Sequence, residues 1–234
     1  MKNRLLFVIV CTLVSGVFFG FGPPPDKSIA LAVKIIHDVS RKGADVDWTA
    51  AKKGDILHSG DQVRTAEHSI AIVKFTDNSM LRVRESSELK LFGEMKDGVF
   101  SKTVNVTKGE FSFDIAKQTD NSKFTFSSPT SVAAIRGTEG VMSSTDAGDQ
   151  LIVLDGLVNL LNSLSNKNVD VGSGQTAISN SDGSIFVRQS TPQETNSAQN
   201  ALNAGQGGGT IKQLDIELKD PDGNKKKLRI KYHQ

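Results

Sequence analysis

Residue types that do chemistry are present in this sequence, but they are not spaced as in a catalytic centre. The four histidines, His37, His58, His68 and His233, are spread along the chain, and none stands in a zinc-binding pattern with an acid or a cysteine. No serine lies in a G-x-S-x-G elbow, and no glycine-rich loop follows a strand to bind phosphate. The sequence therefore favours a non-enzymatic protein with no catalytic, cofactor-binding or metal-binding residue.

The most informative stretch covers residues 128–139, where four apolar residues lead directly into Arg-Gly-Thr-Glu. Gly137 lets the backbone turn, and a nearby carboxylate such as Glu139 could hold Arg136. The stretch therefore predicts a buried corner in which Arg136 has a structural role. Arg64 also stands beside a turn glycine and an acid, so we interpret it in the same way, as a buried or half-buried residue.

Composition limits the classes of protein that fit. A chain of 234 residues with 37% hydrophobic residues suits one domain with extensions. The net charge of +2 provides no global field for nucleic acid, and one Trp and one Tyr do not make a base-stacking platform. We therefore expect no nucleic-acid partner.

Residues 1–32 have the pattern of a targeting segment. A basic start is followed by an uncharged, mostly apolar run over residues 5–22 and by an A-x-A cleavage site at residues 30–32. This pattern favours a signal peptide cut before Val33. The alternative is a retained membrane anchor, because 18 residues at about 1.5 Å each nearly span a bilayer core. Either reading places the rest of the chain in the periplasm or elsewhere outside the cytoplasm.

The single cysteine, Cys11, lies inside the apolar run. A chain cut before Val33 would contain no disulfide, no thiol nucleophile and no cysteine-bound metal. The exported domain must therefore depend on its own hydrophobic core.

From Val33 onward, apolar and polar residues alternate with the period of β-strands. The clearest pair is residues 70–75 and 80–84, which flank the turn sequence Thr-Asp-Asn-Ser and predict a hairpin. Many short strands over residues 33–190 predict an all-β domain, either a β-sandwich or a short β-solenoid. A weak internal echo, in which a glycine and an acid precede an apolar residue, occurs at Gly60, Gly109 and Gly156.

Two further segments follow the domain. Residues 191–209 are rich in Gln, Asn, Ala, Ser and Gly and lack an apolar face, which predicts a flexible linker. Residues 210–234 alternate on both sides of a strong turn sequence and predict a β-hairpin. Its lysines at 225–227 are interpreted as a solvated hairpin edge, with contact to peptidoglycan or anionic lipid as the alternative.

Several motifs in order resemble a FecR domain, named for the periplasmic iron-citrate signalling protein, over about residues 32–177. The first resembles the family's opening motif, a Trp followed by G-D-x-V-R-T, and residues 128–139 resemble its most distinctive segment. The family-motif residues, which we interpret as structural, are Trp48, Gly60, Asp61, Arg64, Thr65, Arg136, Gly137, Thr138 and Glu139.

The resemblance implies an all-β extracytoplasmic domain and, in the best-known members, a role in transmembrane signalling. Those members carry a cytoplasmic anti-sigma segment, whereas here only residues 1–4 precede the apolar run, so the chain resembles a shorter exported type. We expect a sensory or scaffold module of the cell envelope with a protein partner. The alternative is a structural envelope protein that binds peptidoglycan or another glycan. Trp48 and Tyr232 are the only Trp and Tyr, which makes a sugar-stacking site the weaker hypothesis.

Overall fold

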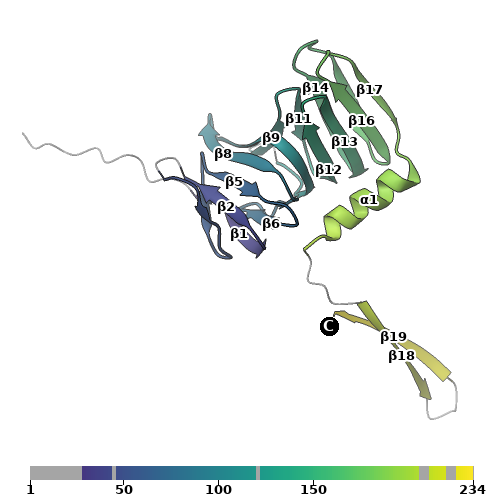
Figure 1. Ribbon diagram of the computed structural model, residues 1–234. Helices are drawn as coiled ribbons and strands as arrows, with labels where there is room; N and C mark the ends of the chain where they lie inside the picture. The colour runs from purple at the N-terminus through teal and green to yellow at the C-terminus, as the bar shows by residue number, and fades with distance from the viewer. Residues whose placement is uncertain (1–27, 44–45, 120–121, 206–210, 220–224, 234) are drawn as a thin grey trace, which may run out of the picture.

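The computed structural model describes residues 28–43, 46–119, 122–205, 211–219 and 225–233, the last two ranges as backbone only. Apart from a C-terminal hairpin, the strands form two layers packed face to face (Figure 1). Sheet A contains, in spatial order, β4 (Ile56–His58), β1 (Ser28–Ile36), β6 (Ile70–Phe75), β7 (Met80–Val83), the second half of β9 (Val99–Ile115), β12 (Thr138–Thr145), β13 (Gly148–Asp155), β16 (Gln175–Asn180) and β17 (Ile185–Gln189). Sheet B contains β3 (Thr49–Ala50), β2 (Val39–Lys42), β5 (Gln62–Thr65), β8 (Glu88–Lys96), the first half of β9, β10 (Ser122–Ser127), β11 (Ser131–Ile135), β14 (Leu157–Asn162) and β15 (Asn168–Gly172).

Strand β9 belongs to both layers. Its first half pairs with β8 and β10 in sheet B, and its second half pairs with β7 and β12 in sheet A. The β9–β10 pair is parallel, whereas the other strand pairs of the described residues are antiparallel. From β10 onward the chain places hairpins in sheet B and sheet A in turn. The all-β prediction is confirmed, and the strands form a sandwich through which the chain winds.

Aromatic side chains from the two layers meet in the middle of the core. Phe124 and Phe126 of β10 contact Phe75, Phe111 and Phe113 of sheet A. The centroids of the Phe111 and Phe126 rings are 4.8 Å apart, and the rings meet edge to face at 77°. All five rings are at most 2% exposed, so they contribute a large part of the buried apolar area that joins the sheets.

Glycines with positive φ stand where the chain passes between layers. Gly109, at φ +105°, marks the point where β9 leaves sheet B, and a Cβ there would lie 2.1 Å from the Ser87 hydroxyl. Gly60 and Gly156, at φ +96° and +97°, have nearly the same conformation at the β4–β5 and β13–β14 crossings. The echo noted in the sequence therefore marks corners of the sandwich, which need a residue without a Cβ.

Strand β1 begins at Ser28, ahead of the cleavage position expected after residues 30–32. Ile29 is fully buried, and the alanines on either side of Leu31 are at most 5% exposed. The first part of β1 pairs with β4 and β6. A cut before Val33 would remove half of this strand, so the β-domain starts earlier than the predicted residue 33, while the cleavage position itself stays a prediction. The segment before Ser28, for which the sequence predicts a signal peptide or an anchor, lies outside the described residues.

Helix α1 (Pro192–Asn203) occupies most of the segment predicted to be a flexible linker, residues 191–209. A capping box closes its first turn, because the Thr191 hydroxyl accepts from Glu194 N and the Glu194 carboxylate accepts from Thr191 N. Proline at the first helical position also suits a helix start. The linker prediction is therefore wrong up to residue 205; residues 206–209 lie outside the described residues.

The helix lies across the outer face of sheet A (Figure 1). Ala198 packs with Val141 and Ile152, and the Ser112 hydroxyl donates to Ala201 O at 2.8 Å. The buried residues of α1 are Ala198, Ala201 and Leu202, so the apolar stripe that docks the helix is short. The helix follows one in-register row of outward side chains, which reads Lys34, Ile72, Arg82, Ser112, Val141, Ile152, Thr176 and Arg188.

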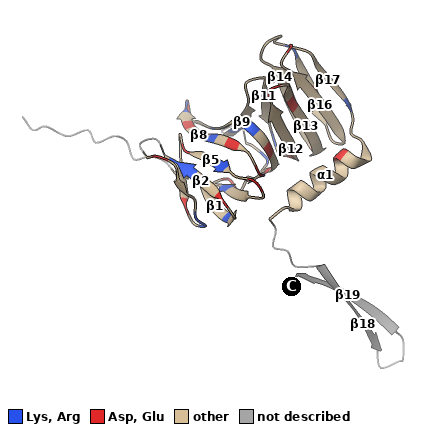
Figure 2. Cartoon of the chain, viewed as in Figure 1, with Lys and Arg blue, Asp and Glu red and all other residues tan. Residues whose placement is uncertain are grey.

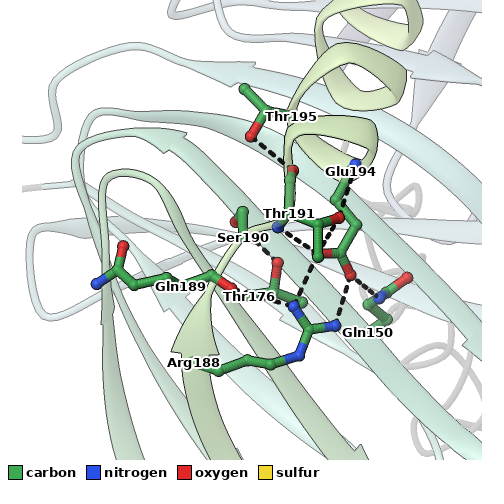
Figure 3. Close-up of polar contacts among 8 residues, drawn as sticks. All are labelled: Gln150, Thr176, Arg188, Gln189, Ser190, Thr191, Glu194 and Thr195. Atoms are coloured by element: carbon green, nitrogen blue, oxygen red, sulfur yellow. Dashed lines mark hydrogen bonds and ion pairs between the residues drawn. The ribbon is translucent and has the colours of Figure 1, made fainter.

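Glu194 fixes the first turn of α1 to the sheet (Figure 3). The Arg188 guanidinium donates to both of its carboxylate oxygens, at 2.7 and 2.8 Å, and Gln150 Nε2 donates at 3.0 Å. Hydrogen bonding from Arg188, together with that from Thr191, outweighs burial and lowers the pKa of Glu194 to about 2. The helix is thus docked by polar contacts at its N-terminal end and by small apolar residues along its length.

The C-terminal segment forms an antiparallel hairpin of β18 (Ile211–Lys219) and β19 (Lys225–His233), with Leu214 opposite Ile230. The connecting turn lies outside the described residues. Helix α1, the one helix in the described ranges, is neither long nor apolar enough to cross a membrane.

Candidate functional site

The outer face of sheet B is open: no described element covers it, whereas α1 covers part of sheet A. Asn105, Ala134 and Asn159 point outward from its middle strands and are exposed. Figure 2 shows charged residues denser on the half of the molecule that holds β1 to β9 than on the half that holds β11 to β17. On sheet B, that charged half is formed by β2, β5 and β8.

Two cation–π pairs lie on this charged half. The Arg64 guanidinium carbon is 4.2 Å from the centroid of the Trp48 ring, and Lys90 Nζ is 5.0 Å from the centroid of Phe92. Their strands β5 and β8 are neighbours, with Gln62 opposite Lys90. We call Trp48, Arg64, Lys90 and Phe92 the aromatic–cationic patch.

The patch combines side chains that dominate many protein interfaces. Arg64 is exposed, whereas Trp48, Lys90 and Phe92 are half-buried. Aromatic rings and arginine are enriched at interface hot spots because they bring a large contact area with few rotatable bonds. An arginine already stacked on a ring also loses less side-chain entropy when a partner binds. The patch is therefore suited to a partner surface with both acidic and apolar groups.

Other residues of the same motif build the corner beneath the patch. Gly60 N donates to Leu91 O at 2.7 Å, and the Asp61 carboxylate accepts from His58 N at 3.0 Å. Asp61 is 4% exposed. These contacts join the start of β5 to β8 and to the end of β4, which supports the corner.

Strand alternation divides the motif between core and surface. Thr65 is 2% exposed; its hydroxyl donates to Arg84 O at 2.5 Å and accepts from Ser87 N at 3.1 Å. Val63 is also buried. Because neighbouring side chains of a strand point to opposite faces, Arg64 between them reaches solvent. The expectation that Arg64 is buried or half-buried is wrong for this reason.

The second motif is divided in the same way. Gly137 forms the predicted turn, at φ +72°, and the buried Thr138 donates from its hydroxyl to Leu157 O at 3.1 Å. Ile135 fills the core, so the next side chain, Arg136, points outward and is exposed. The predicted burial of Arg136 is wrong. Figure 1 shows that the motif passes from β11 in one layer to β12 in the other.

A hollow of about 390 Å³ lies beside Arg136 at the end of β10 and β11. Lys123 and Arg136 border it, and Phe124 and Ile135 contribute apolar atoms. Lys123 of β10 and Arg136, directly after β11, thus place two cations near the family's most distinctive segment, away from the aromatic–cationic patch.

Glu139 lies in β12 of sheet A and is exposed. Burial raises the pKa of Glu139, the negative charges of Asp114 and Asp155 raise it further, and Arg82 opposes them. Arg82 is 3% exposed, and its Nε and Nη1 atoms have no hydrogen-bond partner among the described residues. This charge cluster lies on the face of sheet A that α1 partly covers. The motif therefore begins in sheet B, with β11, and ends on the outer face of sheet A, with Glu139.

An ion pair between a buried lysine and a half-buried aspartate, which the sequence analysis missed, joins the two layers. Lys102 is 1% exposed, and its Nζ lies 2.7 Å from Asp77 Oδ2 and 3.1 Å from the Ser122 hydroxyl. Gln118 Nε2 donates to the same carboxylate oxygen at 3.1 Å. Burial raises the pKa of Asp77, but the hydrogen bonds from Lys102 and Gln118 hold it below its usual range. The signal was a lysine at an inward position of an alternating strand, between Phe100 and Val104.

The fold brings two of the distant histidines together. His37 Nδ1 lies 2.6 Å from His68 O, and His68 Nδ1 lies 3.5 Å from Glu85 Oε2. His58 instead lies beside Asp61. Within the described residues, no group of three or more His, Cys, Asp or Glu side chains could hold a metal ion.

Comparison with known proteins agrees with the fold. Residues 61–159 match the family model described as FecR protein, so the predicted FecR domain is confirmed over that part of the chain. Trp48 and Gly60 precede the matched residues. Two crystal structures of a candidate anti-sigma factor from Parabacteroides distasonis ATCC 8503 share the fold, each with a TM-score of 0.50 and 14% sequence identity. The match covers 64% of this chain and 66% of that protein, slightly under two thirds. A comparison with curated proteins found no match.

Proposed function

We propose that this protein is a non-enzymatic, exported module of the cell envelope that binds a protein partner through the aromatic–cationic patch. The observation that carries the proposal is the stacking of an exposed Arg64 on Trp48, on a sheet face that no described element covers. Both residues belong to the motif that resembles the opening of a FecR domain. A structural role alone does not require a solvated arginine there.

The proteins that share this fold support a sensory or regulatory role. The FecR match covers β5 to β14, and the similar crystal structures are described as those of a candidate anti-sigma factor. Regulators of this kind act by binding proteins.

Export is supported by the basic start and the apolar run over residues 5–22. The A-x-A site at residues 30–32 falls inside β1, where a cut would remove buried Ile29. This favours an apolar run that is retained as an anchor, with the sandwich outside the cytoplasm.

Glycan binding is the second candidate, because Trp48 and Phe92 place two rings on one sheet face, and sugars stack on rings. One face of Trp48 is already covered by Arg64, which reduces the ring area open to a sugar. A separate proposal, which rests only on the lysines of the C-terminal hairpin, is that this hairpin contacts peptidoglycan or anionic lipid.

The test is in-cell photocrosslinking from position 62, since Gln62 lies on β5 between the two cation–π pairs. We expect a discrete protein crosslink that Arg64→Glu reduces at least tenfold. The matched control is Lys167→Glu, a charge reversal at an exposed position just before β15. A crosslink unaffected by Arg64→Glu in a folded protein would contradict the proposal. Muropeptides in place of a protein would support the glycan candidate.

A further inference from the structure

We propose that the corner of the sandwich formed by β1 and β4 rests on an anionic lipid bilayer. The inference depends on the proposed retention of residues 5–22 as an anchor, but not on the aromatic–cationic patch. Its occupant is a lipid surface, which the chain itself would bring close to this corner.

Two large apolar side chains are exposed at the corner. Leu31 of β1 lies opposite Ile56 of β4, and the two are 39% and 52% exposed. The neighbouring Leu57 is 1% exposed, so alternation separates a buried side of each strand from this outward pair. The described elements leave both outward side chains in contact with solvent.

Exposed lysines surround the apolar pair. Lys74 of β6 is the next residue across the sheet from Leu31. Lys52 and Lys53 stand in the turn that enters β4, and both are exposed.

The lysine turn is held rigidly against β1. Gly54 N donates to Ala32 O at 2.8 Å, and Lys52 N donates to Asp55 Oδ2 at 2.9 Å. Asp55 is the acid of this turn, and it is already paired with Arg41, with Nε to Oδ2 at 3.1 Å. The corner therefore presents three lysines whose charge is not balanced by the nearest acid.

Apolar side chains among lysines are the chemistry that binds an anionic membrane surface. The apolar groups enter the boundary between headgroups and acyl chains, and the ammonium groups pair with lipid phosphates. An acidic protein surface would satisfy the lysines equally well, so charge alone does not select the occupant.

The length of chain before β1 selects the lipid surface. Five residues, 23–27, separate the apolar run from Ser28, and five residues span at most roughly 17 Å when fully extended. Leu31 lies only three residues further, about 10 Å along the strand. An anchor in the bilayer thus keeps this corner near the headgroups. The β14–β15 connection lies at the other end of the sandwich, far from β1 (Figure 1).

The test uses the full chain with Cys11→Ser, reconstituted into vesicles of phosphatidylcholine with or without phosphatidylglycerol. Ile56→Cys carries an environment-sensitive dye, and Leu164→Cys, 67% exposed in the β14–β15 connection, is the matched control. We expect a blue shift and protection from iodide quenching at position 56 in the anionic vesicles, with no change at position 164. Equal quenching at the two positions in anionic vesicles would overturn the proposal.

Charge reversal tests the lysines. We expect Lys52→Glu, Lys53→Glu and Lys74→Glu together to abolish the shift, since each lysine near an anionic surface contributes about fivefold and three contribute on the order of a hundredfold. Reversal of three exposed lysines elsewhere, Lys108, Lys123 and Lys167, should leave the shift intact. A shift that survives the first triple variant would refute the role of the lysines.

Alkaline extraction of cell membranes separates this inference from the proposed function. Release of the full chain would show that the anchor is not retained and would overturn the bilayer contact. Crosslinking from position 62 and its loss in Arg64→Glu would still decide the protein-binding proposal independently.

Discussion

The two outer faces of the sandwich differ in what their strands present to solvent. The middle row of sheet A includes Ile72, Val141 and Ile152, each at most 7% exposed beneath or beside α1. The equivalent row of sheet B reads Phe92, Thr103, Thr125, Ala134, Asn159 and Asp170. A sheet face rich in Thr and Asn can stay in water, whereas a row of branched aliphatic residues requires cover. Among the residues that the structure describes, a third layer therefore covers one side only, and the other side is left exposed to solvent.

The cover on sheet A is narrow. The buried residues of α1 are Ala198, Ala201 and Leu202, so the helix contributes little apolar area. Its capping box and the Arg188–Glu194 pair supply much of its attachment. By contrast, the contacts between the sheets include five buried phenylalanine rings. We therefore expect substitutions in the shared interior to lower the free energy of unfolding most. Substitutions at the α1 contact should lower it less, and substitutions on the open face should hardly change it.

The largest effect is expected in the interior that both faces share. Asp77→Ala leaves Lys102 buried without its carboxylate, which should lower the free energy of unfolding by about 3–5 kcal/mol. Urea denaturation measures it, and Asp170→Ala, at an exposed position of sheet B, is the control. A loss of less than about 1 kcal/mol would mean that the pair behaves as a surface ion pair.

A matched pair of acidic substitutions probes the covered face against the open one. Val141→Asp places a charge beneath α1 and should release the helix, lowering the free energy of unfolding by roughly 2–3 kcal/mol. Ala134→Asp, on the open face, should change it by no more than about 0.5 kcal/mol. Hydrogen exchange of the α1 amides follows the helix, and denaturation follows the whole domain. Equal losses for the two variants would remove the distinction between the faces.

The attachment of α1 should depend on its cap and on pH. Thr191→Ala removes the N-cap and should cost about 1 kcal/mol of helix stability. The pKa of Glu194 is lowered from 4.5 to about 2, so its contribution is complete above pH 4.5 and is lost as the pH falls toward 2. Exchange rates of the α1 amides between pH 6 and pH 2, corrected for the intrinsic pH dependence of exchange, test both statements. Retention of full protection at pH 2 would show that Glu194 does not hold the helix.

The smallest change in stability is expected at the open face. Arg64→Ala removes an exposed cation–π contact and should shift the free energy of unfolding by no more than about 0.5–1 kcal/mol, although partner binding should fall. Thermal denaturation measures the first quantity and crosslinking yield the second. A variant that loses its cooperative unfolding transition would instead restore the structural interpretation of Arg64.

The local pattern of apolar and polar residues predicted the strands and turns correctly where side chains alternate between the two faces of a strand. The hairpin expected from residues 70–75 and 80–84 is present as β6 and β7. The turn expected at Gly137 is also present. Both depend on neighbouring residues only, which is why the sequence was sufficient. The capping signal T-P-Q-E before α1 was equally local, and it was overlooked because the helix lacks a broad apolar face.

The roles of residues that depend on partners far away in the chain were harder to predict from the sequence. Arg64 was interpreted as buried because its motif contains turn and core residues, but alternation along β5 sends it outward to Trp48. The Lys102–Asp77 pair joins residues from different layers. Strand alternation marks Lys102 as an inward lysine, but nothing in the sequence identifies Asp77 as its partner. The expected cleavage site matched a short consensus and took no account of the pairing of β1 with β6.

The sequence by itself determined the all-β class, the FecR resemblance, the strand periodicity and the corners marked by glycine, because each follows from backbone preference or from side-chain alternation within a few residues. Only the tertiary structure decided that the layers form a sandwich, that α1 covers one face, and that Trp48 and Arg64 meet on the other. Those outcomes depend on which strands pair and which faces pack, and residues far apart in the chain settle both.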